Sequence, residues 1–427
     1  MSETRTIQIT SGDSLHTYGS IGAMDYTVRL SIRLDSVIDG EILKAALEST
    51  QRRYPYLNLR MKRQEADLYY EENPLPVCLF NTDKRISLNC EENNYHVWAV
   101  CYKDDFVYLD FYHGICDGTG MYMVLSTLLY YYIDGMYGTC DKTGIRTLED
   151  PIDERESIDP TDSLPPMDPA LLARAAANIE PAYSLISDGE TTPLDHEVVR
   201  DVMIPDKELL KFTSQNDASP GTFLAVIIAR AIEQCTPVND KKLRGSYVIN
   251  ARPMLGFPYT HHNCVNTVYA NFSDRFITMP IDRQCTAMRG MTILQSDPDR
   301  VSFAIMRSNL VRRMCLQATT LEARKAAFSQ SLAKGTDLFT FMVSYVGQWK
   351  YEALGKHIME FWTHVPPANN FLVEIAAVKG SIFLSFHQKF KEDKYYRAVL
   401  KQLEDNDILY IEKRVMENDI SHFADVM

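Results

Sequence analysis

One segment of the chain, residues 105–133, constrains the fold more than any other. Apolar residues alternate from Asp105 to Tyr112, which is the period of a half-buried strand. The loop 113–118 follows directly, and the apolar, tyrosine-rich run Met121–Ile133 is long enough for a helix. The sequence therefore predicts a strand-to-helix unit of an α/β protein, with a histidine and an aspartate in its loop.

The length of the chain predicts two domains or two fused subdomains. Its 427 residues exceed the size that one hydrophobic core usually reaches. Apolar residues make up 45% and charged residues 24%, an ordinary globular balance. From Gly138 to Pro169 the composition shifts to proline, acidic and hydroxyl residues, which is typical of a connecting segment. We therefore expect an N-terminal subdomain of residues 1–170 that ends in this connector and a C-terminal subdomain of residues 171–427.

Hydrophobic periodicity and capping residues predict further elements in both halves. Asp39 can cap a helix that Pro55 ends, and Ser219-Pro220 can start a helix that is apolar nearly all round and therefore buried. Lys379-Gly380 predicts a tight hairpin. Strands are expected at 27–34, 68–71, 97–102, 106–112, 196–204, 247–250, 267–272, 339–346, 372–378 and 381–386.

Charge and cysteine content exclude some classes of function. The chain has 44 basic and 57 acidic residues, a formal charge of −13 that opposes nucleic-acid binding. Nine cysteines without a C-x-x-C pair argue against a disulfide framework or a structural zinc site. The first residues contain no apolar signal core, and the run Met121–Ile133 is too short to span a bilayer. We expect a cytoplasmic protein with no transmembrane segment.

The sequence His113-x-x-x-Asp117-Gly118 resembles the signature of the acyl-CoA-dependent acyltransferase superfamily with the chloramphenicol-acetyltransferase-like fold. This group includes alcohol acetyltransferases, wax-ester synthases, plant acyltransferases and peptide-synthetase condensation domains. Other segments resemble family elements in the same order along the chain: Leu34-Asp35-x-x-Ile38-Asp39, Tyr54-Pro55-x-Leu57-x-x-Arg60, Thr222–Ile232, Asn250-Ala251-Arg252 and Ser344-Tyr345-Val346-Gly347. The resemblance implies an α/β fold of two-layer α+β sandwiches, in which two such subdomains enclose a tunnel.

Two departures from the family pattern bear on the acceptor. Condensation domains usually carry two consecutive histidines before x-x-x-Asp-Gly, whereas this chain has Tyr112-His113. Amide condensation on carrier proteins is thereby less favoured. The Asp-Phe-Gly-Trp-Gly of plant members is absent, and only Gly347-x-Trp349 echoes it.

His113 is the expected general base. Its imidazole, with an ordinary pKa of about 6.5, can take the proton of a hydroxyl as that group attacks a thioester carbonyl. No covalent acyl-enzyme is needed. The alternative is a hydrogen-bonded core histidine at a strand end. A nucleophilic Cys116 is a less favoured reading, because a single cysteine beside a tight turn is usually an apolar filler.

The resemblance gives Asp117 a structural role. In the resembling families this carboxylate pairs with the arginine of the Asn-x-Arg element, here Arg252. Asp117 can instead orient the imidazole, as in a triad, or Asp117 or Thr119 can cap the following helix, which need not exclude the pairing. Gly118 is expected to permit a positive φ or close approach of the acyl donor, or to be an ordinary turn glycine.

The sequence gives a weaker indication of the residues that bind the oxyanion and coenzyme A. Ser344, with Asn250, is the candidate for the oxyanion or the tunnel lining. The cluster Lys241, Lys242 and Arg244 is the candidate for the CoA phosphates, and Arg307, Arg312 and Arg313 form a second one; either cluster can be a solvated face. No metal is expected, because the pairs His261-His262 and His357 with His364 lack supporting carboxylates or cysteines at ligand spacing.

The sequence thus predicts a CoA-dependent O-acyltransferase that resembles alcohol acetyltransferases. Acyl-CoA is its co-substrate, no cofactor is permanently bound, and the acceptor is a small or lipid-like hydroxyl compound. Two alternatives stay open. One is condensation with an amine acceptor or a donor bound to an acyl or peptidyl carrier protein, and the other is a non-catalytic docking module of a biosynthetic pathway. The 24 tyrosines and 18 phenylalanines can line a tunnel or pack the core.

Overall fold

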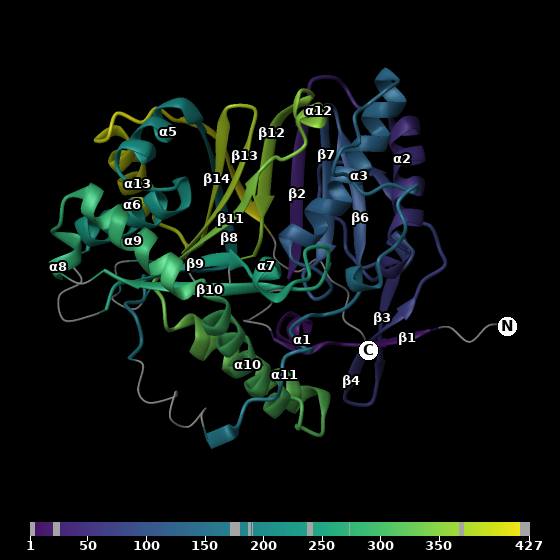
Figure 1. The fold of residues 1–427 in the computed structure, drawn as a ribbon, viewed down its shortest axis with the longest axis horizontal. Helices are drawn as coiled ribbons and strands as arrows, with labels where there is room; N and C mark the ends of the chain where they lie inside the picture. The colour runs from purple at the N-terminus through teal and green to yellow at the C-terminus, as the bar shows by residue number, and fades with distance from the viewer. Residues whose placement is uncertain are drawn as a thin grey trace.

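Two large β-sheets lie side by side, with helices on their outer sides (Figure 1). The computed structural model describes residues 5–19, 26–170, 180–186, 189, 191–236, 242–272, 274–366 and 371–418. It has the mixed α/β architecture expected from the sequence.

The first sheet has five strands in the order β12-β2-β7-β6-β5. These are β12 (Ile358–His364), β2 (Thr27–Leu34), β7 (Phe106–Tyr112), β6 (Trp98–Lys103) and β5 (Leu79–Asn81). Helices α2 (Gly40–Arg53) and α3 (Gly118–Tyr137) pack against each other beside it. A small sheet of β1 (Thr6–Gln8), β4 (Asp67–Glu72) and β3 (Leu59–Gln64) lies below it in Figure 1.

The second sheet has seven strands in the order β10-β9-β11-β13-β14-β8-β15. They are β10 (Val265–Asn271), β9 (Arg244–Asn250), β11 (Phe341–Gln348), β13 (Phe371–Val378), β14 (Ser381–Phe390), β8 (Pro193–Pro205) and β15 (Ile411–Asn418). Its outer side is covered by α5 (Asp206–Gln215), α6 (Pro220–Cys235), α9 (Ile281–Gln295) and α13 (Lys394–Glu404). Helix α6 is buried, as its apolar sequence predicts.

Three further helices pack together below the two sheets in Figure 1. Helix α1 (Ser11–Tyr18) packs against α10 (Pro298–Cys315) and α11 (Leu321–Thr336) at the lower side of Figure 1. Short helices are α7 (Arg252–Leu255), α8 (Asp274–Ile277) and α12 (Glu352–Gly355), and 3₁₀ turns occur at Pro55–Leu57, Glu91–Asn93 and Glu154–Glu156. None of the helices in the described ranges is long and apolar enough to cross a membrane.

Strand β12 joins the two halves of the chain. It comes from residues 358–364, yet it pairs antiparallel with β2, with His364 opposite Arg29. The first sheet therefore includes a strand from the second half. The division into 1–170 and 171–427 stays a proposal. Any such division has to allow for the place of β12 in the first sheet.

Two expectations about local environment need correction. Strand β7 is buried on both faces along most of its length, so it is not half-buried. Its buried Asp110 is neutralised by Arg29, with Oδ1 and Oδ2 each 2.7 Å from a guanidinium nitrogen. The segment 138–169 is more than a connector, because Glu156 and Asp159 within it are buried. Glu156 makes an ion pair with Arg53.

Candidate active site

The loop between β7 and α3 is held at its backbone from three sides. The His113 N–H donates to the carbonyl of Tyr26 at 2.7 Å, and Nδ2 of Asn263 donates to the carbonyl of His113 at 2.7 Å. The hydroxyl of Tyr70 donates to the carbonyl of Gly114 at 3.0 Å. These bonds come from three distant segments, so the position of the imidazole is fixed by the whole fold.

The ring of His113 lies flat against a second imidazole. The centroids of His113 and His16 are 4.1 Å apart, and the ring planes differ by 13°. Nδ1 of His113 is buried and has no hydrogen-bond partner among the described residues. Burial lowers the pKa of His113 below its ordinary value, although the negative charge of Asp117 opposes this effect. The imidazole is therefore neutral at pH 7, which is the form a general base needs.

Asp117 and Arg252 form a buried, bidentate ion pair. Nη1 of Arg252 is 2.8 Å from Oδ2 of Asp117, and Nη2 is 2.7 Å from Oδ1. The guanidinium also donates to the carbonyls of Thr260 and His262, at 2.9 and 2.8 Å. The pair expected from the sequence is thus present, and it ties the loop to the segment that follows β9.

Asp117 is also the N-cap of α3. Its Oδ1 accepts from the N–H of Gly120 at 2.9 Å, and its Oδ2 accepts from the N–H of Cys264 at 3.0 Å. Ion pairing and helix capping therefore occur together. In the part of the chain that the structure describes, no hydrogen bond joins Asp117 to the ring of His113. The triad-like arrangement is absent there.

Three small residues, in the loop and in the first turn of α3, differ in whether a larger side chain would fit. Gly118 does not have the positive φ considered from the sequence, because it is the first residue of α3. A Cβ there would make an ordinary contact with Val346 at 3.6 Å. At Gly120 a Cβ would overlap the carbonyl oxygen of His261, so this position requires glycine. Cys116 is fully buried, and burial raises the pKa of its thiol well above the ordinary value, which argues against a thiolate nucleophile.

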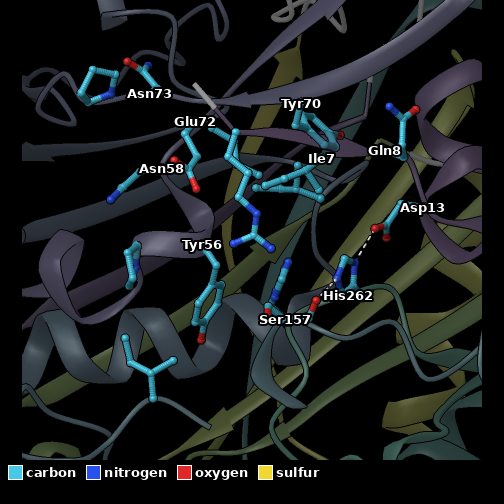
Figure 2. A pocket seen from close by; sticks show the side chains of 17 residues that line it. Ile7, Gln8, Asp13, Tyr56, Asn58, Tyr70, Glu72, Asn73, Ser157 and His262 are labelled. Carbon is cyan, nitrogen blue, oxygen red and sulfur yellow. Dashed lines mark hydrogen bonds and ion pairs between the residues drawn. The ribbon is translucent and has the colours of Figure 1, made fainter. Parts of the chain in front are cut away.

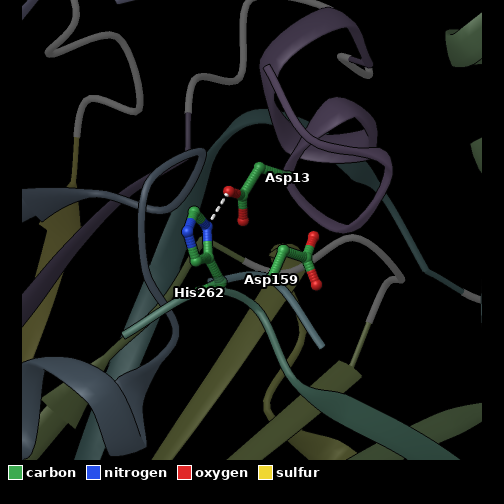
Figure 3. Close-up of side chains that lie close together, drawn as sticks. All are labelled: Asp13, Asp159 and His262. Atoms are coloured by element: carbon green, nitrogen blue, oxygen red, sulfur yellow. Dashed lines mark hydrogen bonds and ion pairs between the residues drawn. The ribbon is translucent and has the colours of Figure 1, made fainter. Parts of the chain in front are cut away.

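A second buried ion pair, Asp13 with His262, lies beside the loop (Figure 3). Nδ1 of His262 is 2.6 Å from Oδ2 of Asp13, and Nε2 is 3.1 Å from the carbonyl of Ser157. Both ring nitrogens face acceptors, so both carry protons and the ring is a cation. Burial opposes this charge, but Asp13 outweighs it and raises the pKa of His262 to about 9.

Asp159 completes a group of three potential metal ligands with Asp13 and His262, whose ligand atoms lie within 4.8 Å of one another. These atoms already have protein partners. Oδ2 of Asp159 accepts from the N–H of Gly12 at 3.1 Å, and its Oδ1 accepts from the N–H of Thr161 at 2.8 Å. A metal ion would have to displace a proton and several hydrogen bonds, so we assign none to this group.

A cavity of about 610 Å³ opens next to the loop (Figure 2). Its wall includes Ile115 of the loop, Tyr70, and the ion pair of Asp13 and His262. It lies between residues of the first half and the segment 261–262. His113 is not among its lining residues, so a tunnel that reaches the imidazole stays a prediction.

The other predicted site residues are distributed differently from the expectation. Asn250 uses Oδ1 to accept from Arg252, from its N–H at 3.1 Å and from Nη1 at 3.3 Å, so it supports the ion pair. Ser344 is partly exposed on β11, two residues from Val346, which faces Gly118. No hydrogen bond within the described ranges links Ser344 to the loop.

Of the basic cluster proposed for the CoA phosphates, Lys242 and Arg244 lie in different environments. Lys241 lies outside the described residues. Lys242 pairs with Glu180 at 2.5 Å, and Arg244 is buried, where it donates to Asn271 Oδ1 and to the carbonyl of Leu338, each at 2.7 Å. Arg244 was expected at the surface because the sequence shows its charge and not its partners. In the structure its guanidinium N–H groups donate to other residues of the protein.

Two members of the second basic cluster contact other parts of the protein. Nη1 of Arg312 donates to the carbonyl of Ser11 at 3.1 Å, and burial lowers its pKa from the ordinary value. Arg313 lies 3.8 Å from Asp162.

Sequence reasoning missed three residues that surround His113. They are His16 and Asp13, both on α1, and Asn263, which binds Asp13 and the His113 carbonyl. The pair His261-His262 had been considered only as metal ligands. Asn263, which follows this pair, could not be recognised from the sequence, because its hydrogen-bond partners Asp13 and His113 are far away along the chain.

No protein-family model matches the chain, and no curated protein matches it in sequence. Solved structures match nearly all of it. Polyketide synthase associated protein 5 from Mycobacterium tuberculosis has a TM-score of 0.62 at 13% identity, covering 93% of this chain and 97% of that one. TRI101 of F. sporotrichioides, complexed with coenzyme A and T-2, has a TM-score of 0.62 at 11% identity, covering 96% and 99%. The condensation domain of the Monacolin K polyketide synthase MokA has a TM-score of 0.60 at 11% identity, covering 94% and 96%.

Proposed function

We propose that this chain transfers an acyl group from a CoA thioester to a hydroxyl group. It has the chloramphenicol-acetyltransferase-like fold of acyl-CoA-dependent acyltransferases and condensation domains. The observation that carries the proposal is the placement of His113. A neutral imidazole stands on a strand-to-helix loop that a buried ion pair fixes to the second half of the chain.

His113 acts as the general base in this proposal. It removes the hydroxyl proton while the oxygen attacks the thioester carbonyl, so a C–O bond forms as the proton moves to the ring. The C–S bond then breaks, and His113 returns the proton to the thiolate. The products are an ester and free coenzyme A, and the enzyme is unchanged. No covalent acyl-enzyme is required.

The supporting loop has the properties that such a base needs. Asp117 and Arg252 hold the loop without contacting the reacting atoms, and Asn250 holds Arg252. Gly118 is the first residue of α3, at the end of this loop. Ser344 is proposed as a donor for the oxyanion, since β11 reaches Gly118 through Val346. The coenzyme A complex of TRI101 supports a CoA donor. Of the proposed phosphate ligands, Lys242 keeps an exposed side chain, whereas Arg244 does not.

Acceptor-dependent release of free thiol tests the proposal. The purified protein is incubated with a panel of acyl-CoAs and alcohols, and free coenzyme A is measured with a thiol-reactive dye. We expect release with wild-type protein and a loss of at least about 100-fold in His113→Ala, the range of a removed general base. His196→Ala is the matched control, because His196 is a surface residue paired with the exposed Asp195. Equal rates in wild type and His113→Ala would contradict the assignment.

Amine acceptors or carrier-bound donors are the second candidate. The structural similarity to a condensation domain favours it, whereas Tyr112, at the position of the additional histidine, does not. Alcohol and amine acceptors are compared with CoA and carrier-protein thioesters under the same conditions. We expect the alcohol with CoA to give the highest kcat/KM. If no thioester is consumed in any combination, the docking-module alternative becomes the better reading.

A further inference from the structure

His16 is the closest aromatic neighbour of the proposed base and has no part in the mechanism described so far. It lies on α1, while His113 follows β7, and their centroids are only 4.1 Å apart. The ring of Tyr26 contacts His16 edge-on, at 4.8 Å and 76°. His16 is thus held between an aromatic edge and the face of His113.

The stacked geometry rules out a direct proton relay between the two rings. Hydrogen bonds of an imidazole lie in the plane of the ring, and these planes are nearly parallel, at 13°. The Nδ1 atoms of both rings are buried and lack a hydrogen-bond partner in the described ranges. The contact therefore acts through packing.

Helix α1 is bonded to the elements that carry His113. The hydroxyl of Tyr112 donates to the carbonyl of His16 at 2.9 Å. Asp13, one turn earlier on α1, accepts from Nδ2 of Asn263 at 2.7 Å, and the same Nδ2 donates to the carbonyl of His113. These bonds restrain the backbones of α1 and the loop relative to each other, which keeps the two rings within stacking distance.

We infer that His16 is a positioning residue: its ring lies flat on His113, fixes the orientation of that imidazole and keeps water away from that face of it. The inference deepens the proposed function and rests on it for its kinetic readout. The ring of His16 covers one face of His113 and excludes water from it, and the loss of water favours the neutral form of an imidazole.

Other charged groups act on the two rings and set the balance. Asp117 and Asp13 favour a charged His113, and Asp13 also favours a charged His16. Arg312, from α10, and His113 itself oppose a charge on His16. Burial lowers the pKa of both histidines and is the largest effect on each. Both rings are therefore neutral near pH 7.

Two substitutions separate packing from a general effect on folding. His16→Phe keeps a flat ring that cannot be protonated, whereas His16→Ala removes the ring and admits water next to His113. In His16→Ala we expect the pKa of His113 to rise toward its ordinary value and kcat to fall by about tenfold through a misoriented base. In His16→Phe both are expected to stay close to wild type.

The experiment measures the acid limb of the pH profile of kcat/KM and, independently, the titration of the His113 ring by NMR. A higher pKa in His16→Ala moves the acid limb to higher pH, while His16→Phe leaves it in place. A purely structural role of His16 would lower the melting temperature of His16→Ala without moving either titration. That result, in folded protein, would overturn the inference.

The NMR titration also separates this inference from the proposed function. If wild-type protein transfers no acyl group but His16→Ala still shifts the titration of His113, the proposed function fails and the role of His16 stands. If wild type is active and neither titration nor kcat changes in His16→Ala, the inference fails and the function stands.

Discussion

Asp117 shows how much one residue contributes at the smallest scale. Its two carboxylate oxygens accept four hydrogen bonds, two from Arg252 and one each from the backbone of Gly120 and Cys264. The carboxylate thereby joins the end of the β7 loop, the start of α3 and the second half of the chain. All four donors are buried, so loss of one partner leaves a charge without compensation.

Arg252→Gln is therefore expected to destabilise the protein by about 3–5 kcal/mol, the usual cost of breaking a buried ion pair from one side. Urea unfolding measures the change. Asp117→Asn should act in the same direction. Arg155→Gln is the control, because Arg155 pairs with Asp153 at the surface, and its removal should leave stability unchanged. Full stability and activity in both Asp117→Asn and Arg252→Gln would show that the pair is unimportant.

The pair of Asp13 and His262 gives a pH dependence of stability with a definite sign. The folded-state pKa of His262, about 9, lies above its unfolded value of about 6.5. Its contribution is fully present below pH 6.5 and is lost as the pH rises through 9. We expect the free energy of unfolding to fall by up to about 3 kcal/mol across this window.

Denaturant unfolding at a series of pH values measures this loss, with His262→Gln as the comparison. The variant should lack the decrease between pH 6.5 and 9. His16, His96, His113, His261 and His364 have lowered pKa values, so they act below this window. The same pH dependence of stability in wild type and His262→Gln across the window would exclude the charged form of His262.

At the scale of elements, the start of α3 depends on close packing rather than on helix propensity. Gly120 lies in its first turn, where a Cβ would overlap the carbonyl of His261 and lie 2.6 Å from Sγ of Cys116. Gly120→Ala is expected to cost about 1–3 kcal/mol, measured by thermal or urea unfolding, despite the higher helix propensity of alanine.

Gly290→Ala is the matched control for this substitution. Gly290 lies inside α9, and a Cβ there would meet no atom within 4 Å. Alanine should stabilise the protein at this position by about 0.5–1 kcal/mol. If both substitutions change stability equally, backbone propensity and not packing governs the start of α3.

Elements with strong local signals were predictable from the sequence. The strands 27–34 and 106–112 have the expected bounds, α2 is capped by Asp39, and Lys379-Gly380 makes a turn with two positive φ values. Strand β12 was missed because its position at the edge of the first sheet is decided by a partner far away in the sequence. The same holds within the site. Local spacing pointed to His113 and Asp117, whereas His16 and Asn263 reach the loop only through the tertiary fold.

At the scale of the whole molecule, the crossing of β12 couples the two halves. Thr363 of β12 donates to the buried Glu374 of β13 at 3.0 Å, and His364 lies 3.2 Å from Asp201 of β8. The strand thus hydrogen-bonds with β2 through its backbone and contacts the second sheet through its side chains. Burial raises the pKa of Glu374 to about 7, so these contacts include a carboxyl group that is partly protonated at neutral pH.

We therefore expect residues 1–170 and 171–427 to be unstable when each is produced alone, because the first fragment lacks β12 and exposes the edge of β2. Refolded together, they should form a complex with the circular dichroism and the cooperative unfolding of the intact chain. Hydrogen exchange at β2 measures the coupling directly: its amides should be protected in the complex and unprotected in the isolated first fragment. Cooperative unfolding of residues 1–170 alone, with β2 protected, would show that the first sheet is complete without β12 and that the halves fold independently.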